Sequence, residues 1–181
     1  MTIQYDVIII GAGAAGMMSA IEAGKRGRKV LLVDHYKKIG EKIRISGGGR
    51  CNFTNIHTNP NKFISQNPKF VKSALSQYTQ NDFINLINKY EIKFHEKKLG
   101  QLFCDHSAQQ IVEMLLKECE LANVSILKEF IIKDVSKEND QYSISTETNQ
   151  YSSRSLIVAT GGLSVPKICC LLYTSDAADE P

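Results

Sequence analysis

The chain has 181 residues, of which 43% are hydrophobic and 23% charged, and its formal net charge is +3. This composition is ordinary for a soluble globular protein, and no apolar run approaches the roughly 20 residues needed to span a bilayer. Asp6 and a glycine-rich turn interrupt the first apolar run, which argues against a signal peptide. We therefore expect a cytoplasmic protein without a membrane partner.

The chain opens with a pattern typical of a β-α-β unit. Tyr5–Ile10 is apolar except for Asp6, as in a parallel strand that is covered on both faces. Ala14–Lys25 predicts a helix, and Lys29–Val33 predicts a second apolar strand that ends at Asp34. A unit of this kind favours a right-handed crossover and a parallel sheet.

The turn between this strand and helix is G-x-G-x-x-G, formed by Gly11, Gly13 and Gly16. Gly11 permits a tight turn, Gly13 lets a pyrophosphate approach, and Gly16 allows the helix to pack closely on the strand. Ala14 and Ala15 then begin the helix, whose N-terminal N–H groups are suited to phosphates. The turn therefore predicts a dinucleotide site.

Asp34 follows the second strand, where a carboxylate accepts hydrogen bonds from the adenosine ribose and disfavours a 2′-phosphate. Ala20 and Gly27 are small residues, which we expect where the helix lies close to the sheet. The alternative is a glycine-tolerant turn that binds no ligand.

Residues 35–68 are predicted to be a long irregular and functional loop. Its centre is a run of three glycines between Ser46 and Arg50, followed by Cys51 and Asn52. The glycines leave no side chain between the backbone N–H groups and a ligand, and Arg50 offers a fork suited to phosphate oxygens or a flavin carbonyl. We interpret this run as a second contact with a long phosphate-bearing ligand.

The rest of the chain alternates helix and strand patterns. Helices are predicted over Lys69–Tyr78 and Asn81–Tyr90, the latter capped by Thr79 and Asp82, and a further helix begins at Ser107 with Gln110 as its capping-box partner. The buried stripe of that helix is predicted to be Ile111, Val112, Leu115, Leu116 and Cys119. The predicted strands are Ile92–His95, Val124–Leu127 in the parallel sheet, the antiparallel pair Phe130–Lys137 and Gln141–Glu147, and Ser155–Ala159, again in the parallel sheet.

These elements predict an α/β fold: a Rossmann-like FAD/NAD(P)-binding domain whose parallel sheet carries helices and a small antiparallel β excursion, and which is truncated. We assign residues 1–168 to the N-terminal part of this domain. Residues 169–181 resemble a translated sequencing adapter, and we expect them to be a non-native tail on a piece of a longer protein.

Two segments carry a resemblance to a known family: G-x-K-x-x-x-S-G-G-G-R-C-N-x-T-N at Gly40–Asn55 and A-T-G-G-L-S-x-P at Ala159–Pro166. With the first glycine turn, they resemble the FAD-dependent oxidoreductase family that includes aminoacetone oxidase-like and BaiN/YhiN-type flavoproteins. The resemblance implies that FAD is bound by Gly11, Gly13, Ala14, Ala15, Gly16, Asp34, Lys42, Ser46, Gly47, Gly48, Gly49, Arg50, Cys51, Asn52, Ile132, Ala159, Thr160 and Gly161.

The same resemblance implies hydride transfer between the flavin and a small organic substrate, with NAD(P)H as a candidate electron donor. One alternative is a nicotinamide-only dehydrogenase, and another is a flavin-binding protein that modifies RNA or regulates it. Because the basic residues are scattered and show no aromatic interleaving, we expect no nucleic-acid partner.

No catalytic residue is assigned from the sequence, and the substrate and oligomeric state stay open. Cys51 lies beside Arg50, but a packing thiol is favoured over a reactive one because no resolving cysteine is near in the sequence. His106 and Asp105 are either a pair or residues of a helix start. The five cysteines and four histidines lack metal-ligand spacing, so we expect no metal.

Overall fold

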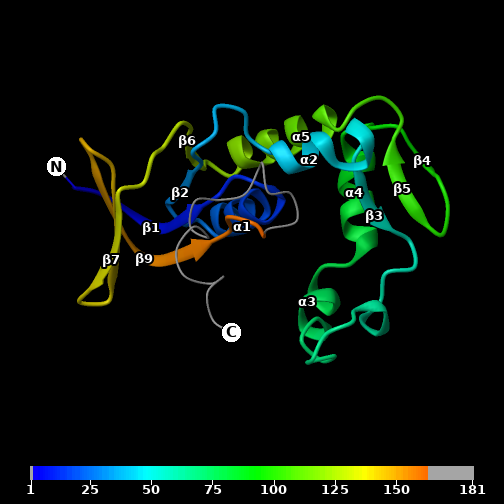
Figure 1. Ribbon diagram of the computed structural model, residues 1–181, viewed down its shortest axis with the longest axis horizontal. Helices are drawn as coiled ribbons and strands as arrows, with labels where there is room; N and C mark the ends of the chain where they lie inside the picture. Colours follow the sequence, from blue (N-terminus) through cyan, green and yellow to red (C-terminus); the bar gives the residue numbers. More distant parts are fainter. Residues whose placement is uncertain (1, 163–181) are drawn as a thin grey trace, which may run out of the picture. The chain divides into compact units, whose positions relative to one another are not determined.

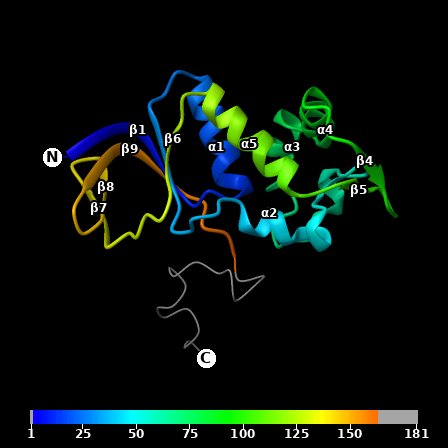
Figure 2. The same cartoon turned by 90° about the horizontal axis from the view of Figure 1, so that it is seen from above.

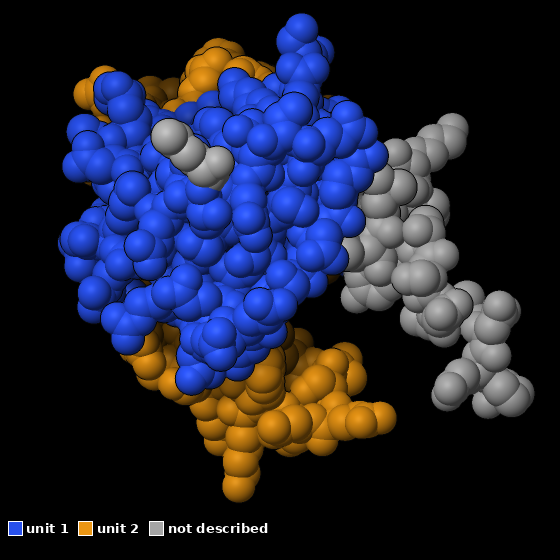
Figure 3. All heavy atoms as spheres, turned by 90° about the vertical axis from the view of Figure 1, so that its left-hand side faces the viewer, with its two compact units in different colours: residues 1–42, 115–181 blue, residues 43–114 orange. Residues whose placement is uncertain are grey.

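The computed structural model describes residues 2–162, which form two compact units (Figure 3). Residues 2–42 and 115–162 belong to unit 1, and residues 43–114 form unit 2. The chain passes from one unit to the other within α2 (Glu41–Ile45) and within α5 (Gln109–Leu121). Each unit has its own β-sheet.

Unit 1 is built on a six-stranded sheet in the order β6-β2-β1-β9-β8-β7 (Figure 1). The four strands from β6 to β9 in this order run parallel, and β8 and β7 continue the sheet antiparallel. The strands are β1 (Thr2–Ile10), β2 (Val30–Val33), β6 (Ser125–Leu127), β7 (Asp134–Glu138), β8 (Gln141–Ser145) and β9 (Gln150–Val158).

The core of unit 1 lies on both faces of β1 and β2. Ile8, Ile9 and Ile10 are consecutive and all buried, and so is every residue of β2. Because side chains alternate along a strand, Ile8 and Ile10 share one face, where they pack with Phe130 and Ile144. The continuous apolar run of β1 thus reflects a strand that is covered on both faces, as predicted.

Helix α1 (Ala14–Lys25) has the predicted bounds and packs against β1 and β2 (Figure 2). A Cβ on Gly24 would lie 2.3 Å from the carbonyl oxygen of Ala122, just after α5, so Gly24 permits the close approach of these two helices. A Cβ on Gly27 would meet no atom within 4 Å, and its φ is +71°. Gly27 therefore serves the turn, and the expectation that it allows close packing on the sheet is wrong.

The predicted antiparallel excursion is present as β7 and β8, whose turn holds Asn139 and Asp140 at positive φ. Strand β9 is longer than the predicted Ser155–Ala159. Its first half pairs with both β1 and β8, which buries Ser152 and Ser153. Pairing on both sides, rather than hydrophobicity, makes this polar stretch a strand.

Unit 2 contains a three-stranded antiparallel sheet in the order β3-β5-β4, and the chain forms η2, α3 and α4 between β3 and β4. Thr79 and Asp82 form the predicted capping box of α4, and the Phe53 ring packs against Phe83 of this helix and against Phe94. The elements are η1 (Ser46–Gly49), β3 (Asn52–Asn55), η2 (Pro60–Lys62), α3 (Lys72–Gln77), α4 (Gln80–Lys89), β4 (Phe94–Glu96) and β5 (Gln101–Cys104).

One capping prediction in unit 2 is wrong. The Ser107 hydroxyl accepts the N–H of Gln109 at 3.1 Å, and the side-chain oxygen of Gln110 has no hydrogen-bond partner within residues 2–162. Ser107 therefore closes a local turn before α5 instead of a capping box. The predicted buried stripe of α5 is confirmed for Ile111, Val112, Leu115 and Cys119, whereas Leu116 is half-buried.

The α/β fold is confirmed, with a mostly parallel central sheet, the antiparallel excursion and a separate small antiparallel sheet. The predicted tail and the Leu163–Pro166 end of the second family segment lie outside the described residues, and the division at residue 168 stays a prediction. Within the described part of the chain, no helix is long and apolar enough to cross a membrane.

Candidate cofactor site

Three loops of unit 1 meet because the strands that precede them are in register. Ile10 of β1 pairs with Val33 of β2 on one side and with Val158 of β9 on the other. The glycine turn, Asp34 and the turn 159–161 therefore follow three neighbouring carboxyl ends. Strand order also reverses here, since the chain leaves β1 for β2 and returns to β9, and ligands of open α/β sheets bind at such switch points.

A glycine is explained by a different physical reason at each of the three positions of the first turn. Gly11 has a φ of +102°, and a Cβ there would lie 2.5 Å from the carbonyl oxygen of Ala159. A Cβ on Gly16 would lie 1.8 Å from the Gly11 carbonyl oxygen, so this position allows no side chain. A Cβ on Gly13 would meet nothing within 4 Å. Gly13 thus leaves open space that a ligand can fill, which fits a pyrophosphate.

The start of α1 offers unpaired donors beside this space. Met17 makes the first helical hydrogen bond, to the Gly13 carbonyl oxygen at 3.0 Å. The backbone N–H groups of Ala14 and Ala15 have no partner among residues 2–162, and both residues are exposed. No acidic residue occupies the first turn of the helix. Its positive dipole end is therefore available to an anion.

The carboxylate of Asp34 is tied to the glycine turn. One oxygen accepts the N–H of Ala12 at 2.6 Å, and the other accepts the N–H of Tyr36 at 2.8 Å. Each carboxylate oxygen has a second lone pair, so the predicted bonds to ribose hydroxyls remain possible. Asp34 consequently fixes the backbone of the phosphate turn as well as offering ribose acceptors.

Lys42 and the turn after β9 are brought together. Ala159 donates its N–H to the Ile10 carbonyl oxygen at 2.8 Å, which holds Ala159 and Thr160 against Gly11, and Gly161 lies beside the Lys42 side chain. The ammonium of Lys42 donates to the carbonyl oxygen of Gly162. Two predicted cofactor-binding segments of unit 1, which are far apart in sequence, thus share one edge of the sheet.

The family resemblance implies that Ile132 contacts the cofactor on its adenine side. Ile132 packs against the cluster that contains Ile8 and Phe130. The N–H of Phe130 donates to the Asp34 carbonyl oxygen at 2.9 Å, which places this segment alongside the end of β2. Its contact with an adenine stays a prediction.

In unit 2, the second glycine run adopts a left-handed turn. Gly47, Gly48 and Gly49 have φ values of 57°, 68° and 84°, and Cys51 follows at 52°. A Cβ on Gly47 would lie 2.7 Å from the ring of Phe103, whereas one on Gly48 would meet nothing within 4 Å. The run therefore requires glycine for its backbone, and Gly48 leaves open space.

The neighbours of this run divide into exposed and buried groups. Arg50 and Asn52 are exposed, and the Ser46 hydroxyl donates to the Ile43 carbonyl oxygen at 2.7 Å. Cys51 is buried, and this burial raises the pKa of its thiol in spite of a hydrogen bond with Ser46. A raised pKa supports the favoured interpretation of Cys51 as a packing thiol.

A second cysteine lies closer to Cys51 than the sequence suggested. The N–H of Cys104 donates to the Arg50 carbonyl oxygen at 2.9 Å, and burial, together with charge repulsion from Cys51 and Asp105, raises the Cys104 pKa to about 11. No cysteine is near Cys51 in the sequence, but the fold brings Cys104 close to it. Both thiols are free and stay protonated at neutral pH.

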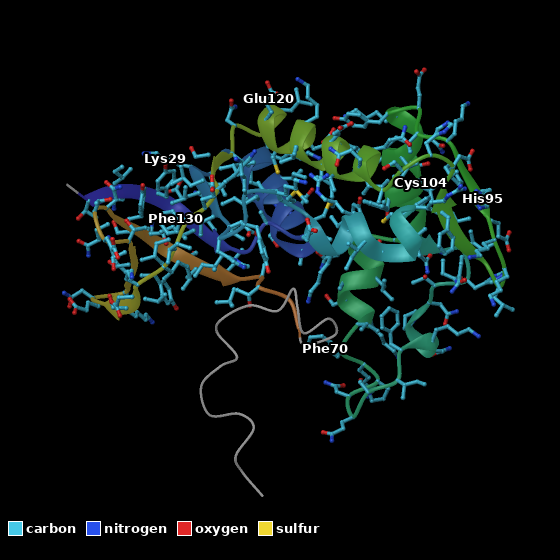
Figure 4. The ribbon with its side chains drawn as sticks, turned by 45° about the horizontal axis from the view of Figure 1, so that its top comes forward. Lys29, Phe70, His95, Cys104, Glu120 and Phe130 are labelled. Carbon is cyan, nitrogen blue, oxygen red and sulfur yellow. The ribbon has the colours of Figure 1, made fainter. Side chains whose placement is uncertain are left out.

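Asp105 pairs with a different histidine from the one considered in the sequence. Its carboxylate lies 2.7 Å from Nδ1 of His95, whose ring stacks on Phe103. Figure 4 shows the position of His95 on β4. Both side chains are more than a third exposed, so we assign the pair no catalytic role. Among residues 2–162, no group of three His, Cys, Asp or Glu side chains could hold a metal ion.

A feature of unit 2 was missed in the sequence. Every residue from 61 to 70 is exposed, including Phe63 and Phe70, each of which directly follows a lysine. The expectation of basic residues without aromatic interleaving is wrong for this stretch. The absence of any Asp or Glu between residues 43 and 81 is the sequence signal that would have identified it.

The chain is similar in sequence to a known protein family and to two named proteins. Residues 5–178 match the family described as HI0933-like protein Rossmann domain. Two relatives are named ribosomal RNA dihydrouridine synthase: the Escherichia coli protein is 53% identical over 90% of this chain and 41% of its own length, and the Haemophilus influenzae protein is 50% identical over 98% and 45%. The chain thus spans less than half the length of these relatives.

More distant similarities share the fold. The 3-dehydro-bile acid delta(4,6)-reductase of Clostridium scindens is 24% identical over 85% of this chain and 38% of its own length. The structure of 3-ketosteroid-delta4-(5alpha)-dehydrogenase from Rhodococcus jostii has a TM-score of 0.63 and 12% identity, and covers 89% of this chain and 46% of its own. The halogenase PltM in complex with phloroglucinol and FAD has a TM-score of 0.51 and 17% identity, over 86% and 34%.

Proposed function

Since this chain belongs to the HI0933-like family of Rossmann domains, we propose that it forms the FAD-binding part of an oxidoreductase that reduces uridine to dihydrouridine in ribosomal RNA. The observation that carries this proposal is the identity of half or more to two proteins named for that product, over 90% of the chain or more. A FAD-binding oxidoreductase-type Rossmann domain is the part that family and fold support directly.

The residues of unit 1 fit the ADP half of FAD. The open space at Gly13 and the unpaired N–H groups of Ala14 and Ala15 would receive the pyrophosphate, and Asp34 would accept from the ribose. Thr160 and Gly161 would close the adenosine side. A carboxylate at Asp34 and the free helix start complement each other, because one binds hydroxyl donors and the other binds anions.

By the family resemblance, the residues that would line the pyrophosphate, ribityl and flavin region are Ser46, Gly47, Gly48, Gly49, Arg50, Cys51 and Asn52 of unit 2, together with Lys42 of unit 1. We retain them as proposed contacts. The guanidinium of Arg50 is exposed and has no ion-pair partner within residues 2–162, so it is available to a phosphate or to a carbonyl oxygen. Cys51, in contrast, would contribute packing rather than a thiolate.

The reaction adds two hydrogens across the C5–C6 double bond of uracil. When bound, FAD supplies a hydride from its reduced form, and the protein holds and orients the two reactants. NAD(P)H is our proposed source of the electrons. No residue of this chain is assigned to deliver the second hydrogen as a proton.

A small organic substrate is the second candidate. It is favoured by the similarity to a bile-acid reductase, although at 24% identity over 38% of that protein's length. A nicotinamide-only dehydrogenase is disfavoured by the resemblance of Ser46–Asn52 to a flavoprotein segment. Both alternatives predict that the protein forms no dihydrouridine in RNA, and the nicotinamide-only dehydrogenase also predicts that it binds no FAD.

The test uses the intact protein supplied with FAD, NADPH and ribosomal RNA that lacks dihydrouridine. We expect flavin absorbance in the purified protein and dihydrouridine in the RNA, detected by mass spectrometry of its nucleosides. Flavin without dihydrouridine would contradict the RNA substrate and leave a small organic substrate. A folded protein that takes up NADH but no FAD would contradict flavin chemistry altogether.

A further inference from the structure

Positive charge is concentrated in one part of unit 2. The unit contains nine Lys and Arg residues and five Asp and Glu residues, a formal charge of +4 where the whole chain has +3. All five acids lie at or beyond Asp82, so residues 43–81 contain five basic residues and no acidic one. This half of the unit is therefore suited to a polyanion.

Three of these basic residues lie in residues 59–78, which we call the Lys-Phe segment. Lys62, Lys69 and Lys72 are all exposed, and none has an ion-pair partner among the residues that the structure describes. Because no neighbouring carboxylate neutralises these lysines, their positive charge is available to a bound phosphate. Their exposure means that binding requires no rearrangement of a core.

Exposed apolar side chains directly follow two of these lysines in the sequence. Phe63 is 42% exposed, Phe70 is 77% exposed, and Ile64 lies fully in solvent. Figure 4 shows Phe70 in the loop that leads into α3, away from the β4–β5 hairpin. Large apolar side chains held in water carry a free-energy cost unless a partner covers them.

The segment is shaped by its own hydrogen bonds. The side chain of Asn59 accepts the N–H of Asn61 at 3.0 Å, and that of Asn67 accepts the N–H of Lys69 at 3.1 Å. The N–H of Phe70 donates to the Asn67 carbonyl oxygen at 3.1 Å. These turns hold the backbone beside each Lys-Phe pair, and both rings keep surface exposed to solvent.

We propose that the Lys-Phe segment is a docking surface for single-stranded RNA, with Phe63 and Phe70 stacking on bases and Lys62, Lys69 and Lys72 contacting phosphates. This inference rests on the proposed function, because RNA is the substrate there. Aromatic rings next to basic side chains bind single strands with little sequence preference, since every base has a π-face. Chemistry on a base also requires that base to leave its stack, which a single strand permits.

The charge pattern favours RNA over other occupants. A protein partner or another part of the same polypeptide would be suited to the phenylalanines, but neither explains three unpaired lysines in a stretch without acids. The two explanations separate experimentally. Phosphate contacts give binding a salt dependence, whereas rings covered by polypeptide contribute to folding stability.

The experiment measures binding of a fluorescently labelled oligouridylate of about 15 nucleotides to the intact FAD-loaded protein over a series of salt concentrations. The first variant is Lys62→Gln, Lys69→Gln, Lys72→Gln. Its matched control is Lys117→Gln, Lys128→Gln, Lys133→Gln, which removes the same charge from exposed lysines of unit 1. We expect the slope of log affinity against log salt to fall by about 2 in the first variant only, at roughly 0.7 per phosphate contact.

A second pair of variants tests the rings. Phe63→Leu with Phe70→Leu should weaken binding at least about tenfold with little change in the salt slope, and Phe63→Tyr with Phe70→Tyr should retain binding because tyrosine also stacks. FAD content and melting temperature verify folding in each case. Leucine variants that melt earlier but bind RNA like the wild type would overturn the proposal, as would equal losses in both lysine variants.

The outcomes also separate this inference from the proposed function. If the wild-type protein forms dihydrouridine in ribosomal RNA and every segment variant binds the oligouridylate normally, the docking surface is wrong and the function stands. If the wild type neither binds RNA nor forms dihydrouridine, both are wrong.

Discussion

At the scale of single residues, Asp34 shows how one side chain shapes a loop and offers a ligand contact. Its two oxygens accept the N–H groups of Ala12 and Tyr36. Position alone predicted an acid for the ribose. The hydrogen bond to Ala12 could not be predicted, because it depends on how the glycine turn folds back over the end of β2.

We predict that Asp34→Asn weakens FAD binding by roughly 10- to 100-fold, the usual loss when a hydrogen bond to a charged group is removed. The amide has only one accepting atom and cannot receive both backbone N–H groups. Asp6→Asn is the matched control, because Asp6 also accepts a backbone N–H, that of Lys29 at 2.7 Å, away from the turn. Fluorescence titration with FAD checks both, and equal affinities would contradict the assigned role.

The buried thiols predict a loss of stability at high pH. Burial raises the pKa of Cys104 and of Cys119 from 9.0 to about 11. Because the folded state favours the protonated thiols, their contribution to stability is fully present below pH 9 and is lost as the pH rises towards 11. Urea unfolding of wild type and Cys104→Ala across this range checks the prediction: the free energy of unfolding should fall less steeply in the variant, and parallel curves would contradict it.

At the scale of elements, the sequence predicts those helices, caps and hairpins that short stretches of sequence determine. The β-α-β unit, the capping box of α4 and the β7–β8 hairpin were all predicted from short stretches of sequence. Strands β3, β5 and the first half of β9 were missed. These strands are short or rich in polar residues, so their sequences carry no clear strand pattern. They form by pairing with segments distant in the sequence, such as Asn52 with Phe103.

The contact between α1 and the end of α5 gives a prediction in which two effects oppose each other. Helix propensity favours Gly24→Ala by about 1 kcal/mol. The new Cβ, however, would lie 2.3 Å from the Ala122 carbonyl oxygen, so we expect the variant to be destabilised. Asn85→Ala, on the exposed face of α4, is the control in which propensity acts alone and stability should rise slightly. A more stable Gly24→Ala in urea unfolding would contradict the close packing.

At the scale of the whole molecule, the sequence was informative about unit 1 and much less so about unit 2. The sequence predicted the phosphate turn, Asp34 and the turn after β9, and the structure brings their positions together at one sheet edge. In unit 2, exposure was the missing information. Phe63 and Phe70 resemble core residues in a sequence, and only the fold shows that they lie in solvent.

The most direct test of the central claim is the binding of FAD at Gly13. A Cβ there would meet no protein atom, and the residue is a helix N-cap with ordinary φ, so Gly13→Ala should cost less than about 1 kcal/mol of stability. We predict that the intact wild type binds one FAD per chain and that Gly13→Ala, equally well folded, binds it at least about tenfold more weakly because the methyl group occupies the pyrophosphate space. Equal FAD affinity in the two proteins, or no FAD binding by the wild type, would contradict the account.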